Sequence, residues 1–187
     1  MKAYKVRKAI AIPYFDHDNK SLANTIRNSS ARRKMNPIVF AVRKIRNILY
    51  SRWSFKSPLN SLRVKWNRKR GVTIGDNVYI GLHTVIDNAY PEFVYIEDNV
   101  SVAESVLIIA HSNPYPHFKN IVESSVAPIV IKEGAWIGSG AIILRGVTIG
   151  KSAIISAGTI VDKDVPDYTL AQGNPMKLVT DFSALIE

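Results

Sequence analysis

A six-residue repeat between Ile74 and Pro166 constrains the fold more than any other feature of this sequence. Each unit begins with an aliphatic residue, and the next residue is usually small or acidic. The twelve units in this register begin at Ile74, Ile80, Ile86, Ile96, Val102, Ile108, Ile131, Ile137, Ile143, Ile149, Ile155 and Val161. Regular self-similarity of this kind is the sequence signature of a repeat architecture.

Six residues are too few for a helical repeat unit, and the excess of β-branched residues favours short strands. A strand and a turn every six residues form one side of a triangular coil, so that three units close a coil. Stacking the coils buries the aliphatic residues in a continuous core. The strands of an ordinary sandwich lack so regular a register, and the pattern therefore predicts an all-β solenoid.

The register is interrupted twice, and each interruption predicts a loop. The first adds four residues after the Ile86 unit and the second adds five after the Ile108 unit. The second loop carries the titratable side chains His111, His117 and Glu123. Because loops on a rigid scaffold commonly carry function, we expect the active site there.

The composition excludes several kinds of site. The chain of 187 residues has no cysteine, which excludes a disulfide framework, a thiolate nucleophile and a cysteine-based zinc site. No run of eighteen apolar residues indicates a transmembrane helix, and no signal peptide is evident. We therefore expect a cytoplasmic protein, with contact at the inner face of the cytoplasmic membrane as a further possibility.

The positive charge lies almost entirely in the first third of the chain. Residues 1–70 have a net charge of +17, whereas residues 71–187 have a net charge of −7. Asn36 and Pro37 form a helix-start signal, and apolar residues then recur at helical spacing among basic ones. This basic amphipathic segment predicts either a cap on the first coil or contact with an anionic membrane. No nucleic-acid-binding motif accompanies the charge, so a nucleic-acid partner is not expected.

Three segments are predicted from these patterns. Residues 1–70 form a basic, partly helical N-terminal segment, of which 1–35 show no sustained periodicity and predict little order. Residues 71–166 form the solenoid domain, with the loop in which we expect the functional site at 111–128. Residues 167–187 form a C-terminal turn and tail, with a short strand or helix.

Three motifs in order resemble those of the left-handed parallel β-helix acyltransferases. These motifs are Ile109-Ala110-His111-Ser112, the stretch from Pro128 to Gly140, and Val161 to Pro166 followed by Gly173 to Lys177. The chain is most similar to the branch with galactoside and maltose acetyltransferases and polysaccharide O-acetyltransferases, over roughly residues 71–180. The resemblance implies the left-handed β-helix, a homotrimer, and acetyl-CoA as co-substrate without a metal ion.

The resemblance also assigns a catalytic histidine and a supporting carboxylate. His111 matches the general base, and neutral imidazole can remove a hydroxyl proton near pH 7. Glu123 matches a loop glutamate that would orient the histidine, although it reads equally well as a solvated loop residue. The acceptor-binding asparagine of the family has no clear match here, and His83 or Asp87 would take its place.

Cofactor contacts are implied at a further set of positions. They are Trp136, Ser139, Gly140, Ala157, Lys163 and Lys177. Trp136 would wall the thioester channel or only pack, and the two lysines would meet the phosphates of coenzyme A or remain solvated.

The resemblance predicts an acetyl-CoA-dependent O-acetyltransferase that acts on a sugar hydroxyl, in bacterial surface polysaccharide biosynthesis or on a free saccharide. The alternatives are an N-acetyltransferase of an amino sugar nucleotide and, more distantly, a serine acetyltransferase. A γ-type carbonic anhydrase with zinc on His83, His111 and His117, or a non-catalytic scaffold, would belong to different functional classes.

Overall fold

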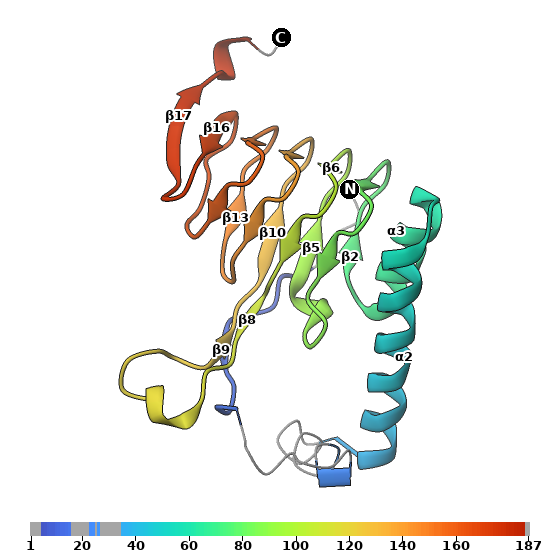
Figure 1. The fold of residues 1–187 in the computed structure, drawn as a ribbon. Coiled ribbons are helices and arrows are strands. Elements are labelled where there is room, and N and C mark those ends of the chain that lie inside the picture. The colour runs from blue at the N-terminus through green and yellow to red at the C-terminus, as the bar shows by residue number, and fades with distance from the viewer. Residues whose placement is uncertain (1–4, 16–22, 25, 27–34, 186–187) are drawn as a thin grey trace.

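Parallel strands wind around a triangular core in this computed structural model, which describes residues 5–15, 23–24, 26 and 35–185 (Figure 1). The first face contains β2 (Thr73–Ile74), β5 (Val94–Ile96), β10 (Ile129–Ile131) and β13 (Thr148–Ile149). The second contains β3 (Tyr79–Ile80), β6 (Ser101–Val102), β11 (Trp136–Ile137), β14 (Ile154–Ile155), β16 (Thr169–Gln172) and β17 (Lys177–Asp181). The third contains β4 (Val85–Ile86), β7 (Leu107–Ile108), β12 (Ile142–Ile143) and β15 (Ile160–Val161).

The six-residue register explains both the strands and the core. Each of the twelve predicted starting residues ends or lies within a strand, and eleven of them are at most 1% exposed, with Ile74 at 9%. Neighbouring coils align start on start, as Ile80 with Val102 and Val102 with Ile137. The solenoid prediction is confirmed.

Helices α2 and α3 come directly before the solenoid and lie along its first coil. Helix α2 (Pro37–Lys56) begins where the sequence predicts, because the Asn36 side chain accepts hydrogen bonds from the N–H groups of Ile38 and Val39. Helix α3 (Asn60–Arg70) ends at Gly71, whose φ of 110° suits glycine. No helix in the described part of the chain combines the length and apolar character needed to cross a membrane.

Helix α3 covers the open end of the first coil with three arginines. The guanidinium of Arg68 donates to the carbonyl oxygen of Ile74, that of Arg63 to Ile80, and that of Arg70 to Ile86. These carbonyls occupy equivalent positions on the three faces and have no preceding coil to pair with. Part of the basic charge of the N-terminal third therefore satisfies backbone acceptors that an uncapped solenoid end leaves open.

The long insertion forms a hairpin that projects from the solenoid (Figure 1). Its arms are β8 (His111–Ser112) and β9 (Ser125–Val126), and η2 (Pro116–Phe118) lies between them. The N-terminal β1 (Ile10–Ala11) adds a third antiparallel strand beside β9. The sequence predicts little order over 1–35, and β1 departs from that expectation, because a two-residue strand has no periodicity to detect. The rest of that range lies largely outside the described residues.

The C-terminal tail forms an antiparallel hairpin at the far end of the second face. Strand β17 pairs with β16 and is exposed along its length, and η3 (Ser183–Leu185) follows it. Turn residues 173–176 join the two strands.

Candidate active site

Both interruptions of the repeat leave the solenoid at the same corner. The first follows β4 and contains η1 (Pro91–Phe93), and the second follows β7. Strands β4 and β7 are hydrogen-bonded neighbours on the third face, with Ile86 opposite Ile108. The two loops therefore start one above the other, which brings Asp87 of the first against His111 of the second.

Asp87 is the carboxylate that contacts His111. Its Oδ2 atom lies 2.6 Å from His111 Nδ1 and also accepts from the Ala110 N–H at 2.8 Å. Its Oδ1 atom accepts from the N–H groups of Ala89 and Tyr90, each at 2.8 Å. The Asp87 side chain is fully buried, so these four donors replace its hydration.

The surroundings of Asp87 favour its ionised form. Burial alone would raise its pKa, but the hydrogen bond and charge of His111 and the backbone donors of Tyr90 and Ala89 together lower the pKa below the ordinary value of 3.8. An ionised carboxylate only accepts hydrogen bonds, so the His111 Nδ1 atom carries the proton. The lone pair of Nε2 is then available to a substrate, and this is the tautomer that a general base requires.

The His111 ring is held from two sides and partly open on a third. Strand β9 pairs with His111 through Val126, and the Tyr90 ring lies 5.4 Å from the imidazole between centroids. The His111 side chain keeps 28% of its surface exposed. The ring is therefore positioned by packing while an edge stays accessible.

His111 lines a cavity of about 850 Å³ between the solenoid corner, helix α2 and the segment around β1. In Figure 1 the β8–β9 hairpin and the first half of α2 lie on opposite sides of the lower part of the molecule. Its apolar surfaces include Ile12, Phe15, Tyr90 and Phe93. Its size suits a ligand of the dimensions of a small saccharide.

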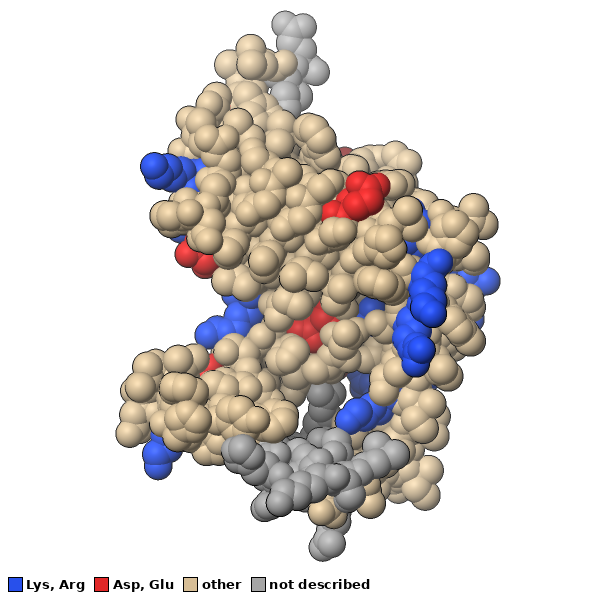
Figure 2. Space-filling model, viewed as in Figure 1, with Lys and Arg blue, Asp and Glu red and all other residues tan. Residues whose placement is uncertain are grey.

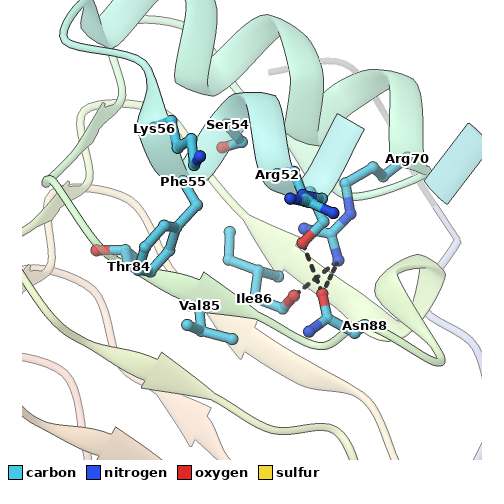
Figure 3. Close-up of a pocket in the computed structure, with 10 residues that line it drawn as sticks. Arg52, Ser54, Phe55, Lys56, Arg70, Thr84, Val85, Ile86 and Asn88 are labelled. Carbon is cyan, nitrogen blue, oxygen red and sulfur yellow. Dashed lines mark hydrogen bonds between the residues drawn. The ribbon is translucent and has the colours of Figure 1, made fainter. Parts of the chain in front are cut away.

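Arg70 of α3 links this corner of the solenoid to both helices through hydrogen bonds. Its guanidinium donates to the carbonyl oxygens of Ile86 and Asp87 and to the side chains of Asn47, Asn67 and Asn88. Figure 3 shows Arg70 reaching Ile86 and Asn88 beside a second, smaller cavity of about 250 Å³. Burial lowers the pKa of Arg70 to about 10, partly offset by the charge of Asp87, and the side chain remains a cation at neutral pH.

The other carboxylate and histidine predicted for the site lie elsewhere. Glu123 is exposed in the loop, and its side chain makes no hydrogen bond or ion pair with another described residue. His83 lies at the corner between the second and third faces, where its ring is 5.1 Å from that of Phe55. The contact expected of Glu123 is made by Asp87, which the sequence predicts, with His83, only as a substitute for the unmatched acceptor-binding asparagine. The roles predicted for Glu123 and His83 stay predictions.

Most of the predicted cofactor residues lie away from the corner of His111. Ser139, Gly140 and Ala157 are exposed at the corner between the second and third faces, on the third and fourth coils. Trp136 is 54% exposed on the second face. Lys163 follows β15 at the corner of His111, and Lys177 begins β17. Within one chain, the third face separates Ser139 and its neighbours from His111.

The three histidines of the zinc alternative are spread over separate elements. His111 is in β8 and holds Asp87, His83 contacts Phe55, and the His117 ring lies 4.0 Å from that of Phe118. Among the residues that the structure describes, no three His, Asp or Glu side chains form a group that could hold a metal ion.

Part of the repeat matches a known protein family. The family description "Bacterial transferase hexapeptide (six repeats)" matches residues 128–163. The chain is 38% identical over 110 residues to the putative acetyltransferase YJL218W of Saccharomyces cerevisiae, a match that covers 58% of this chain and 55% of the relative. It is 35% identical over 113 residues to galactoside O-acetyltransferase of Escherichia coli, covering 60% and 55%. The matches thus span about half the length of these curated relatives.

Solved structures share the fold over a larger part of the chain. A hexapeptide-repeat acetyltransferase of Vibrio cholerae superposes with a TM-score of 0.65 at 22% identity, covering 76% of this chain and 92% of that chain. A maltose O-acetyltransferase of Clostridium difficile gives 0.56 at 25% identity, covering 75% and 87%. A galactoside acetyltransferase in complex with coenzyme A gives 0.55 at 24% identity, covering 78% and 83%. The predicted left-handed β-helix is thereby confirmed, and the family match covers residues 128–163 of it.

Proposed function

We propose that this protein transfers an acetyl group from acetyl-CoA to a hydroxyl of a saccharide, with His111 as the general base. The observation that carries the proposal is the His111–Asp87 pair, at 2.6 Å, on the wall of a cavity large enough for a saccharide. The relatives named as galactoside and maltose O-acetyltransferases support both the donor and the acceptor class.

The geometry accounts for each proton transfer. His111 Nε2 accepts the hydroxyl proton as the acceptor oxygen attacks the thioester carbonyl, forming a C–O bond. The fixed charge of Asp87 stabilises the imidazolium that results. The tetrahedral intermediate then collapses, the C–S bond breaks, and the imidazolium returns the proton to the departing thiolate. The products are the acetylated saccharide and coenzyme A, and His111 regains its starting protonation state.

The residues predicted to bind the acetyl donor have the exposure and charge that suit coenzyme A. The space beside the Gly140 Cα is open, because a Cβ atom at this position would have no neighbouring atom within 4 Å, and Ser139 is exposed next to it. An extended pantetheine arm could approach such backbone closely. Lys163 and Lys177 are exposed cations on a solenoid whose net charge is negative, which suits the phosphates of the cofactor.

We also propose that the active protein is a homotrimer. The support is the separation of Ser139, Gly140 and Ala157 from His111 by the third face of one chain. In a trimer, these predicted cofactor-binding residues of one copy would face His111 of a neighbouring copy. Sedimentation equilibrium would test this directly.

A role in surface polysaccharide biosynthesis at the inner face of the cytoplasmic membrane is a further part of the proposal. Its support is helix α2, which has no acidic residue and exposes Ile38, Val42, Ile45 and Trp53 between basic side chains. Such a helix suits the interface of an anionic membrane. Flotation with anionic and neutral vesicles would test this.

The decisive experiment measures thiol release from acetyl-CoA with a panel of saccharides, amino sugars and serine. We expect saccharide-dependent release in the wild type and at least a hundredfold lower kcat in His111→Ala. His117→Ala, a histidine of the same loop that does not contact Asp87, is the matched control and should keep its activity. Equal rates in wild type and His111→Ala would refute the assignment, and preference for amines or serine would redirect the acceptor class.

A further inference from the structure

The cavity that His111 lines has a strongly basic wall. Among the residues that the structure describes, the charged side chains around it are the cations Arg7, Arg43, Lys44, Arg46 and Arg70 and one acid, Glu92. Three of the cations come from helix α2, which contains no acidic residue. In Figure 2, Lys and Arg side chains gather along the side of the molecule formed by the helices. A cavity of this charge attracts anions.

Two of these cations are already engaged within the protein. Arg43 forms an ion pair with Glu92 at 3.1 Å, and the buried Arg70 is held by asparagine side chains and backbone carbonyls. Neither can meet a ligand without losing these partners. Both nevertheless hold the wall rigid, because one ties α2 and the other ties α3 to the loop that follows β4.

Lys44 and Arg46 remain available to a ligand. Neither forms an ion pair with an acidic side chain among the described residues, and Arg46 is exposed while Lys44 is partly buried. Arg7, whose guanidinium lies 5.6 Å from the centroid of the Phe93 ring, lines the cavity from the segment before β1. The free cations therefore approach the cavity from two elements.

We infer that the acceptor is an anionic saccharide, one that carries a phosphate or diphosphate bound by Lys44 and Arg46 while its hydroxyl meets His111. A neutral sugar would leave these cations without a partner, whereas a phosphate offers several strong acceptors that suit the arginine fork and the lysine ammonium. The apolar surfaces of Tyr90 and Phe15 in the same cavity suit the faces of the sugar ring. This inference rests on the proposed acetyl transfer and specifies its substrate.

Matched acceptors test the inference. Each sugar of the panel is offered as its methyl glycoside, as its 1-phosphate, and as a polyprenyl diphosphate in phosphatidylcholine vesicles. We expect at least one phosphorylated form to exceed the methyl glycoside tenfold or more in kcat/KM. If kcat/KM exceeds that of the methyl glycoside for both phosphorylated forms, the acceptor is soluble. If it does so only for the polyprenyl diphosphate in vesicles, the acceptor is lipid-linked. Equal kcat/KM for all three forms would overturn the inference while leaving acetyl transfer intact.

Two double variants of α2 assign the site. Lys44→Gln/Arg46→Gln removes the two free cations that α2 contributes to the cavity, and we expect at least a tenfold higher KM for the phosphorylated acceptor with little change for the methyl glycoside. Arg52→Gln/Lys56→Gln removes the same residue types on the same helix beside the smaller cavity of Figure 3. A similar rise in KM in both double variants would show that only the total positive charge of α2 matters, and it would refute phosphate binding by Lys44 and Arg46.

A binding measurement separates this inference from the proposed reaction. Calorimetry with glucose 1-phosphate, in the presence of saturating coenzyme A, needs no turnover. Binding that weakens tenfold in Lys44→Gln/Arg46→Gln, but not in Arg52→Gln/Lys56→Gln, supports the anion site. If no thiol is released with any acceptor, the proposed reaction fails, whereas absence of this binding difference refutes the anion site.

Discussion

Asp87 Oδ2 lies 2.6 Å from His111 Nδ1, and the two residues come from successive coils of the solenoid rather than from one loop. Stacked coils are held by regular parallel hydrogen bonds, as between Asp87 N–H and the carbonyl oxygen of Ile108 at 2.9 Å. The distance between the acid and the imidazole is therefore fixed by the repeat itself. A pair built in this way needs little reorganisation as the imidazole becomes charged.

Asp87→Asn should lower kcat by roughly 10²-fold or more, because an amide cannot stabilise the imidazolium and can donate to Nδ1, which favours the wrong tautomer. Steady-state thiol release measures the effect, and circular dichroism confirms that the variant is folded. Glu123→Gln is the control, since Glu123 does not contact the ring. A large loss in Glu123→Gln with full activity in Asp87→Asn would instead support the loop glutamate as the orienting group.

Asp87 should also contribute stability that depends on pH. Its pKa is lowered in the folded protein, so its ionised form favours folding above the ordinary value of 3.8. That contribution is lost as the pH falls through the lowered folded pKa. The difference in free energy of unfolding between wild type and Asp87→Asn should therefore be constant near neutrality and shrink in acid below about pH 4. Urea unfolding from pH 7 to pH 3 measures it, and a difference that grows in acid would contradict the assignment.

The capping arginines provide a test that separates stability from catalysis. Arg63→Met and Arg70→Met should each lower the free energy of unfolding by roughly 2–4 kcal/mol, because each leaves several buried acceptors unpaired. Only Arg70 donates to the carbonyl oxygen of Asp87, so only Arg70→Met should also lower kcat. Denaturant unfolding and thiol release on both variants provide the comparison. Equal kcat losses would show that the activity follows general stability instead of the position of Asp87.

The repeat could be predicted from the sequence because every residue that packs in the core recurs at a fixed spacing. The sequence positions alone predict that successive coils of one face bury Val102, Ile137 and Ile155. The short strand β1 could not be predicted in this way. It pairs Ile10 with Val126, more than a hundred residues later, and such a pairing leaves no local pattern.

The partner of His111 differs from the predicted one although the sequence holds a usable signal. Ile86 and Ile108 each begin the third six-residue unit of a coil, so the two interruptions must leave the solenoid at the same corner. That rule places Asp87 directly against the loop of His111. Glu123 is predicted because it matches a loop glutamate of the family that the chain resembles. A residue on a projecting hairpin, however, is less firmly positioned than one stacked on the next coil.

Gly138 and Gly140 should differ in their tolerance of a side chain. A Cβ atom on Gly138 would lie 2.6 Å from the Ala157 backbone nitrogen of the next coil, which cannot move aside, and Gly138→Ala should cost roughly 2–3 kcal/mol. Gly140 has open space beside it and a φ of 68°, so Gly140→Ala should cost about 1 kcal/mol from backbone strain alone. Denaturant unfolding of both variants measures the difference, and the reverse order would contradict the close approach of the coils.

Lys163 should reveal whether the corner of His111 also holds the phosphate end of the cofactor. Its ammonium is exposed, and a contact with the 3′-phosphate of coenzyme A should make Lys163→Gln bind coenzyme A roughly 3–10-fold more weakly. Dephospho-coenzyme A lacks that phosphate, so its dissociation constant should be the same in variant and wild type. Lys151→Gln is the control, because Lys151 already pairs with Glu133 at 3.5 Å. Equal weakening for both cofactors would place Lys163 at the pyrophosphate, and no weakening for either would show that it is a solvated surface charge.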